Sequence, residues 1–170
     1  MIESFATHDA FLGMPVKQFL AEYWQKKPLL IRQAFPDYQA PLSPEDLAGL
    51  ACEQGPLARL VTYQREQDKW HLRNGPFEES EFPTLGHKDW TLLVQDMDKW
   101  DGDIAQLLEA FHFIPRWRID DIMISFAVAG GSVGPHIDQY DVFLLQAQGH
   151  RQWQIEDKAR LEPAFREDSE

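Results

Sequence analysis

The chain has 170 residues, of which 44% are hydrophobic, and a formal net charge of −12. This length and composition predict one folded domain with a real core and exclude a chain that is disordered throughout. The acidic balance argues against general nucleic-acid binding, which needs clustered positive charge. It fits either an acidic surface that maintains solubility or a basic partner. No stretch has the pattern of a signal peptide or a membrane span, so we expect a cytoplasmic protein.

The N-terminal part is expected to be mainly helical. Residues 1–14 are interpreted as a lead-in, and 15–27 as a helix that ends with two lysines before Pro28. Residues 29–31 are predicted to form a short buried strand. A second helix is expected over 43–53, because Ser43-Pro44 combines an N-cap residue with a proline suited to the first turn.

Strands at 59–63 and 69–72 are predicted next, joined by a charged loop. Two further helices are expected over 89–100 and 104–113, because their apolar residues recur at helical spacing. In the first of these helices the expected apolar face consists of Leu92, Leu93 and Met97. The only cysteine, Cys52, excludes an internal disulfide, and its apolar neighbours predict a small buried side chain rather than a nucleophile.

From Trp117 onward the apolar period changes to that of strands. Strands are predicted at 122–128, 136–147 and 151–155, with a glycine-rich loop at 130–134. Helices followed by strands predict an α+β fold, with a helical N-terminal layer packed on an antiparallel sheet. We interpret residues 1–156 as one domain portion and 157–170 as a polar, charged tail.

The glycine-rich loop leads directly to His136-Ile137-Asp138. Because successive side chains of a strand point to opposite faces, His136 and Asp138 should point the same way. An imidazole and a carboxylate are two of the three ligands in the facial triad that holds non-haem Fe(II). The alternative is that His136 is a hydrogen-bonded histidine near the end of a sheet. The other five histidines fit solvated or structural positions, and even His150 lies too far along the predicted hairpin to be a good third ligand.

Other polar residues near this pair have both a functional and a structural interpretation. Arg151 could hold a dicarboxylate with its planar guanidinium, and Ser125 could add a hydroxyl; otherwise Arg151 is an exposed residue of an edge strand. Tyr140 should share a face with Asp138. Asp120 and Asp121 could face a basic substrate, although paired acids before a strand usually face solvent.

The chain resembles the bacterial JmjC-type, cupin-like 2-oxoglutarate oxygenases that hydroxylate an arginine of a large-subunit ribosomal protein. The similarity extends in order along nearly the whole chain. It rests on five blocks of sequence: Tyr23–Leu29, Ser43–Leu50, Asp89–Gln95, Trp117–Phe126 and Gly134–Phe143.

This resemblance implies a double-stranded β-helix in which His136 and Asp138 bind Fe(II). It further implies that 2-oxoglutarate chelates the iron, that Arg151 and possibly Ser125 hold its distal carboxylate, and that O₂ is the second co-substrate. A basic ribosomal protein is then the expected substrate, with no direct role for nucleic acid or membrane. Homodimers are expected of full-length relatives.

The chain departs from the family pattern after the first half of the β-helix. The second half supplies the third iron ligand in the family, so an apparently truncated chain should bind iron weakly and be inactive or impaired alone. One alternative is a non-catalytic acidic module that binds a basic ribosomal protein. Another is a small cupin that uses Mn or Zn with an external ligand.

Overall fold

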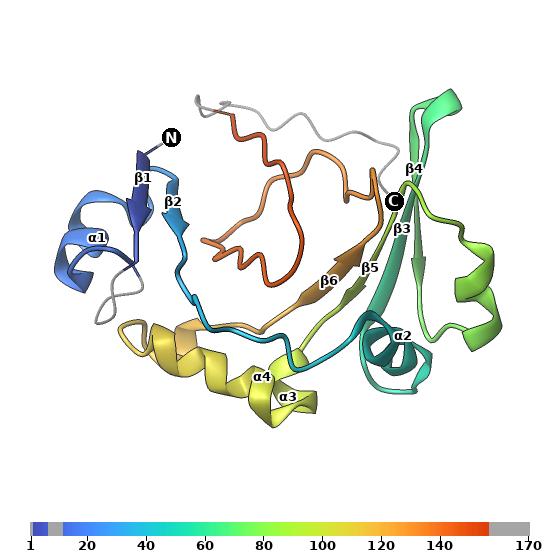
Figure 1. Cartoon of the computed structure of the whole chain (residues 1–170), viewed down its shortest axis with the longest axis horizontal. Coiled ribbons are helices and arrows are strands. Elements are labelled where there is room, and N and C mark those ends of the chain that lie inside the picture. Colours follow the sequence, from blue (N-terminus) through green and yellow to red (C-terminus); the bar gives the residue numbers. More distant parts are fainter. Residues whose placement is uncertain (1, 7–11, 157–170) are drawn as a thin grey trace.

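The computed structural model describes residues 2–6 and 12–156, and its larger sheet has four antiparallel strands (Figure 1). The strand order in this sheet is β4-β3-β5-β6. Its strands are β3 (Ala58–Gln64), β4 (Lys69–Asn74), β5 (Trp90–Val94) and β6 (Ile124–Ala127). A separate two-stranded parallel sheet joins β1 (Ile2–Phe5) to β2 (Leu29–Arg32). The region predicted to be a lead-in therefore contains a strand.

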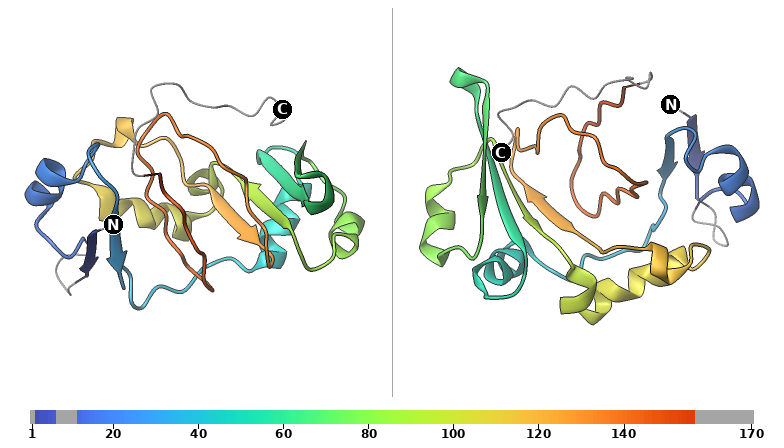
Figure 2. Two further views of the ribbon diagram at one scale, coloured as in Figure 1. Left: turned by 90° about the horizontal axis from the view of Figure 1, so that it is seen from above. Right: turned by 180° about the vertical axis from the view of Figure 1, so that it is seen from behind.

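Four short α-helices accompany the sheets: α1 (Val16–Glu22), α2 (Pro44–Cys52), α3 (Met97–Trp100) and α4 (Gly102–Gln106). Single 3₁₀ helices occupy Arg65–Gln67, Glu79–Thr84, Leu107–Phe111 and Arg116–Arg118. Helices α2, α3 and α4 lie along one side of the four-stranded sheet (Figures 1 and 2). In the described residues, no helix has the length and apolar character needed to cross a membrane.

The main core lies between these helices and the sheet. It combines side chains of α2, β3, β5, α3 and α4 with one aromatic residue, Phe77, from a connecting segment. Its buried members are Leu47, Ala51, Ala58, Leu60, Phe77, Trp90, Leu92, Val94, Met97 and Ile104. A smaller core of Leu12, Phe19 and Tyr23 supports the region of α1. The α+β prediction is therefore confirmed.

The helix predicted over 89–100 is wrong for most of its length. Residues Trp90–Val94 form β5, and all five are buried between β3 and β6. A short continuous apolar run is typical of a strand that is covered on both faces, and over five residues it also fits helical spacing. Only Met97–Trp100 is helical.

The other helix predictions are confirmed in position but not always in length. Ser43 forms a capping box with Asp46 at the start of α2, as the local sequence predicted. Helix α1 ends at Glu22 instead of Lys27, and Lys26 folds back so that its ammonium donates to the Ala21 carbonyl. A lysine thus still lies near the C-terminal carbonyls of that helix. The helix predicted over 104–113 is α4 followed by a 3₁₀ helix.

The strands predicted at 136–147 and 151–155 do not form in the structure. A strand exists through hydrogen bonds to a neighbour, and among the described residues nothing pairs with these two segments. The chain after β6 lies between the β1–β2 pair and the four-stranded sheet (Figures 1 and 2). Phe143 anchors it there by packing on Phe19, Trp24, Phe111 and Phe113. The tail predicted at 157–170 lies outside the described residues.

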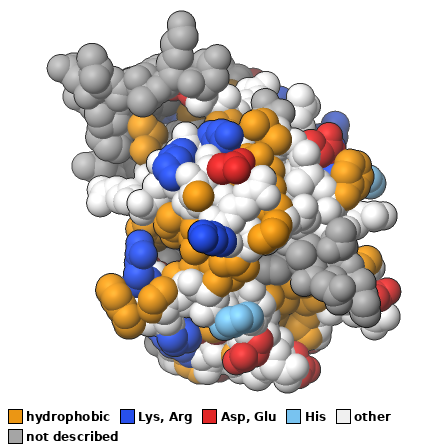
Figure 3. Space-filling model, turned by 90° about the vertical axis from the view of Figure 1, so that its left-hand side faces the viewer, with side chains coloured by type: hydrophobic (Ala, Val, Ile, Leu, Met, Phe, Trp, Pro, Cys, Tyr) orange, Lys and Arg blue, Asp and Glu red, His pale blue; other side chains and the backbone are white. Residues whose placement is uncertain are grey.

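The face on the left of Figure 1 has a mixed surface. Figure 3 shows Lys and Arg side chains interspersed with hydrophobic ones on this face. Phe5 of β1 and Leu20 of α1 belong to the exposed hydrophobic residues of the described chain. The strongly acidic character of the whole chain is therefore not uniform over its surface.

Candidate metal centre

The glycine turn, defined here as residues 130–134, is held close to the start of β5. The Gly131 N–H donates to the Val128 carbonyl at 2.8 Å, and Lys88 forms a parallel bridge with Ala129. A Cβ atom on Gly131 would overlap the Trp90 carbonyl oxygen, so only glycine permits this approach. Gly130 has a φ of +77°, and glycine adopts such a positive φ without the steric cost that a side chain would add.

The far end of the glycine turn packs on an aromatic pair of the β3–β4 hairpin. Trp70 stacks on Tyr63 with a centroid separation of 4.3 Å. A Cβ on Gly134 would lie 3.1 Å from the Trp70 ring, so the backbone rests directly on the indole. The Gly134 N–H donates to the Ser132 hydroxyl at 3.1 Å, which tightens the turn just before His136.

His136 and Asp138 come together at the end of this turn. The distance from His136 Nε2 to Asp138 Oδ2 is 3.6 Å, and both side chains are about half exposed. The two side chains therefore point the same way, as alternation predicted, although the backbone here is not a strand. His136 Nδ1 lies 3.0 Å from the Gly134 carbonyl oxygen. A carbonyl only accepts, so Nδ1 carries the proton in that contact and Nε2 is the nitrogen that faces the carboxylate.

This donor set fits a divalent cation. With its Nδ1 on the Gly134 carbonyl, His136 presents Nε2 toward a carboxylate oxygen, and an imidazole nitrogen beside a carboxylate is a donor pair suited to a divalent cation. The carbonyl contact at Nδ1 is the kind of support that fixes the orientation of a metal-binding histidine. Imidazole with carboxylate matches two positions of the facial triad.

A third ligand is not found in the described part of the chain. Within residues 2–6 and 12–156, no group of three His, Cys, Asp or Glu side chains is placed to hold a metal. His150 is exposed and joins no such group. His8 lies outside the described residues. The structure therefore presents two donors of a possible triad.

The residues predicted to bind a co-substrate are not in contact with this pair. Arg151 is half-buried, with its guanidinium 5.7 Å from the centre of the Trp153 ring. Ser125 is exposed on β6, opposite Leu93 of β5. In the described chain, no hydrogen bond or ion pair connects Arg151 or Ser125 with His136.

The residues predicted to face a substrate have different environments. Tyr140 is 65% exposed, so its ring is accessible to a partner. The carboxylate of Asp121 accepts the backbone N–H of Asp96 at 2.9 Å and thus supports the connection between β5 and α3. Asp120 is exposed. The side chain of Asp120 therefore faces solvent, as the structural alternative expected, whereas Asp121 is half-buried and bonded to the backbone.

An ion pair between Arg65 and Asp89 lies against Gly130 and was not predicted from the sequence. Arg65 Nε and Nη2 donate to the two oxygens of Asp89 at 2.8 and 2.5 Å. These hydrogen bonds lower the pKa of Asp89 below its usual range. No local pattern marks the pair, since the two residues are 24 positions apart and meet only through the register of β3 and β5.

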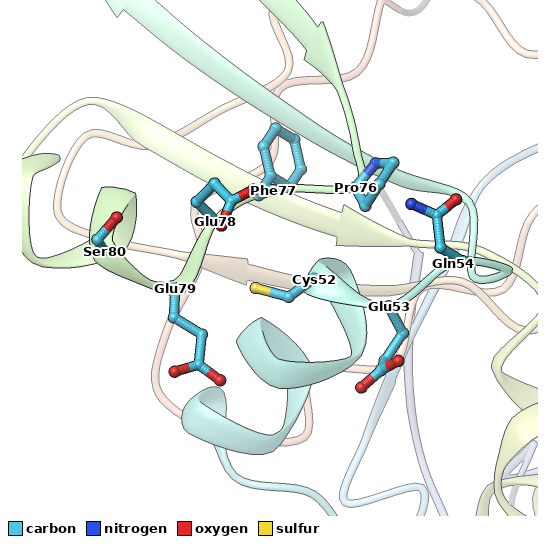
Figure 4. A pocket seen from close by; sticks show the side chains of 8 residues that line it. All are labelled: Cys52, Glu53, Gln54, Pro76, Phe77, Glu78, Glu79 and Ser80. Atoms are coloured by element: carbon cyan, nitrogen blue, oxygen red, sulfur yellow. The ribbon is translucent and has the colours of Figure 1, made fainter.

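A cavity of about 790 Å³ lies elsewhere, between the end of α2 and residues 76–80 (Figure 4). Its lining includes Cys52 with Glu53, Glu78 and Glu79. Burial, and then the nearby glutamates, raise the pKa of the Cys52 thiol. Its Sγ also contacts the Ala48 carbonyl at 3.3 Å. The raised pKa disfavours the reactive thiolate, and Cys52 is half-buried instead of fully buried as predicted.

The chain matches a known protein family and several known proteins. The model of the JmjC domain family matches residues 106–170. "Ribosomal protein uL16 3-hydroxylase" of Escherichia coli strain K12 is 46% identical over 143 residues, which cover 84% of this chain and 37% of that protein. "Probable ribosomal oxygenase" of Haemophilus influenzae is 46% identical over 137 residues, or 81% of this chain and 33% of that protein. The chain thus spans about a third of the length of these relatives.

Solved structures of E. coli YcfD, described as a ribosomal oxygenase, have a similar fold. Complexes of YcfD with cobalt and 2-oxoglutarate, and with cobalt and succinic acid, each match with a TM-score of 0.69 and 44% identity. Each match covers 74% of this chain and 34% of the other. The JmjC or cupin fold predicted for this chain is confirmed by these neighbours.

Proposed function

Since the chain belongs to the JmjC-type ribosomal oxygenases over the third of their length that it spans, we propose that it supplies His136 and Asp138 as iron ligands of a 2-oxoglutarate-dependent protein hydroxylase. The observation that carries this proposal is the 3.6 Å approach of His136 Nε2 to Asp138 Oδ2. The complexes of YcfD with cobalt and 2-oxoglutarate support the choice of a metal and this co-substrate.

The two side chains have distinct tasks in such a site. Fe(II), with 2-oxoglutarate and O₂, would supply the oxidising power that hydroxylation of a C–H bond requires. His136 donates a nitrogen lone pair, and its contact with the Gly134 carbonyl fixes the plane of the ring. Asp138 contributes a negative charge that offsets that of the cation. The third ligand of a facial triad would come from outside the described residues.

Arg151 and Ser125 are proposed to hold the distal carboxylate of 2-oxoglutarate. The Arg151 guanidinium is a planar fork that can form two hydrogen bonds to one carboxylate. It is half-buried and already rests on Trp153, which limits the freedom it would lose on binding.

A basic ribosomal protein, modified on an arginine, is the proposed substrate. The net charge of −12 favours encounter with a basic partner through long-range attraction. The exposed Tyr140 and Asp120 are the candidate contacts, because a phenol and a carboxylate suit an arginine side chain. We expect this reaction to take place in the cytoplasm.

Direct metal binding tests the site without requiring turnover. Mn(II) binding to the chain, followed by electron paramagnetic resonance, should be lost in His136→Ala and in Asp138→Ala. The matched control is His112→Ala, because His112 is also exposed and its Nδ1 also contacts a backbone carbonyl, that of Glu109, at 2.8 Å. Equal Mn(II) affinity in His136→Ala and in the wild-type chain would contradict the proposal.

A non-catalytic module that binds a basic ribosomal protein is the second candidate. It is favoured by the two-donor site together with the charge of −12. The two candidates differ in product: only the hydroxylase converts 2-oxoglutarate to succinate. Succinate formed by the 170-residue chain, and abolished by His136→Ala, would exclude the second candidate.

A further inference from the structure

The Arg65–Asp89 ion pair lies directly against the first residue of the glycine turn. Two parallel hydrogen bonds join the guanidinium to the carboxylate, and the Asp89 side chain is only 18% exposed. A Cβ on Gly130 would overlap Asp89 Oδ1 and lie 2.6 Å from Arg65 Nη2. The backbone of the turn therefore rests on the charged groups with no space for a side chain.

Asp89 also joins the glycine turn to the sheet through its own backbone. Its N–H donates to the Ala129 carbonyl at 2.9 Å, and its carbonyl accepts from the Tyr63 N–H at 2.8 Å. Asp89 has a φ of +64°, which is uncommon for a residue with a side chain. The ion pair and both backbone bonds hold it in this conformation, so Asp89 is fixed between β3 and the turn.

The same hairpin supports both ends of the turn. Arg65 lies over the Tyr63 ring at 5.7 Å, Tyr63 stacks on Trp70, and Trp70 contacts Gly134. Gly134 in turn provides the carbonyl that orients His136. A continuous series of contacts thus runs from Arg65 to the imidazole.

We propose that Arg65 and Asp89 are positioning residues that fix the glycine turn and thereby set the relative placement of His136 and Asp138 for a metal ion. This inference rests on the proposed function for the statement that the pair binds a metal ion. The placement of the imidazole can be measured without any metal. In the described chain, no hydrogen bond or ion pair joins Arg65 or Asp89 to His136 or Asp138, so both act through the backbone of the turn. An ion pair with two parallel bonds suits this task because it fixes direction as well as distance.

Arg73 provides a matched control for Arg65. It belongs to the same hairpin, pairs with Glu81 at 2.6 Å and lies 5.5 Å from the Phe77 ring. Its guanidinium side chain is 54% exposed, compared with 62% for Arg65. The two arginines therefore have similar environments, but only Arg65 touches the glycine turn.

Two measurements on Arg65→Gln, Asp89→Asn and Arg73→Gln test the inference. The imidazole signals of His136 and His112 are followed by NMR, and Mn(II) affinity is measured on the same samples. Arg65→Gln and Asp89→Asn should shift the His136 signal and leave that of His112 in place. They should also weaken Mn(II) binding by about 10- to 100-fold, the usual effect of losing a residue that supports a ligand. Arg73→Gln should change neither quantity.

The outcomes separate this inference from the proposed function. An unshifted His136 signal in folded Arg65→Gln would overturn the positioning role, whatever the metal affinity. A similar shift in Arg73→Gln would also overturn it, because the effect would then be one of general stability. A wild-type chain that does not bind Mn(II), but whose His136 signal shifts in Arg65→Gln, would refute the proposed function and leave the positioning role intact.

Discussion

Phe143 stacks on Trp24 with a centroid separation of 5.8 Å and an angle of 23° between the rings. This contact attaches the chain that follows the candidate site to the region of α1, more than a hundred residues earlier. Phe111 meets the same phenyl ring at 4.7 Å. The segment after the glycine turn is thus held by side-chain packing in place of strand hydrogen bonds.

Phe143→Ala should destabilise the chain by about 1–3 kcal/mol, less than a fully buried phenylalanine because the ring is partly exposed. Urea denaturation measures the loss. Tyr140→Ala is the control, since Tyr140 is 65% exposed. If both variants lose the same stability, the aromatic contacts of Phe143 do not anchor the segment.

Thr91→Val should stabilise the chain by about 1 kcal/mol or more, because it removes a buried hydroxyl that lacks a partner. Thr91 is fully buried in β5, and within the described chain its Oγ1 has no hydrogen-bond partner. Valine has nearly the same shape. Thr62→Val on β3 is the control, since Thr62 is only partly buried. A loss of stability in Thr91→Val, measured by thermal unfolding, would indicate that the hydroxyl is satisfied.

Asp46 should contribute stability that disappears in acid. Hydrogen bonds from the Ser43 backbone and hydroxyl lower the pKa of Asp46 from its ordinary value of 3.8. A carboxylate whose pKa is lower in the folded state stabilises that state above its unfolded pKa. This contribution is lost as the pH falls below 3.8 and through the folded pKa. The stability difference between the wild type and Asp46→Asn should therefore shrink in acid, as measured by urea unfolding across pH. A difference independent of pH would contradict this assignment.

Cys52 should react slowly with thiol reagents near neutral pH. Its pKa is raised first by burial and then by Glu79, so little of the reactive thiolate is present. The rate should increase with pH, and Glu79→Gln should accelerate it only modestly because burial is the larger cause. Glu66→Gln, in the β3–β4 connection, is the control. Reaction at the rate of a free cysteine would show that the thiol is accessible and ionised.

Local sequence signals predicted the elements that depend on local chemistry. The Ser43-Pro44 start of α2 is one example, because the cap and its partner are three residues apart. The β3–β4 hairpin is another, with Gln64 opposite Lys69 across a short connection. These features are determined by neighbouring residues, so the printed sequence contains nearly all the information that specifies them.

Elements that depend on distant partners were harder to predict. Trp90–Val94 is a strand because β3 and β6 pair with it on either side, and its own apolar run is equally compatible with a helix. Residues 136–147 alternate like a strand but have no paired neighbour in the described chain. In both cases the missing information is the identity of the neighbouring segment.

The candidate site shows the same division. His136 and Asp138 were predicted to point the same way because they are two residues apart. Arg65 and Asp89 could not be predicted, since only the sheet register brings them to Gly130. The two-residue spacing of His136 and Asp138 is visible in a sequence, although no strand forms there, whereas support from another strand is not visible.

Strand β3 pairs with β4, which is close in sequence, and with β5, which is farther along the chain. This arrangement implies an order in which the strands pair during folding. Closing the short connection to β4 costs little entropy, whereas pairing Thr62 with Trp90 closes a loop several times longer. Pulse-labelled hydrogen exchange should therefore show protection of β3 and β4 before that of Gly131. Asp89 immediately precedes β5, so its contacts with the glycine turn form only after β5 has joined the sheet. The histidine and aspartate would then reach their arrangement only after β5 has joined the sheet, and would lose it when the sheet loosens.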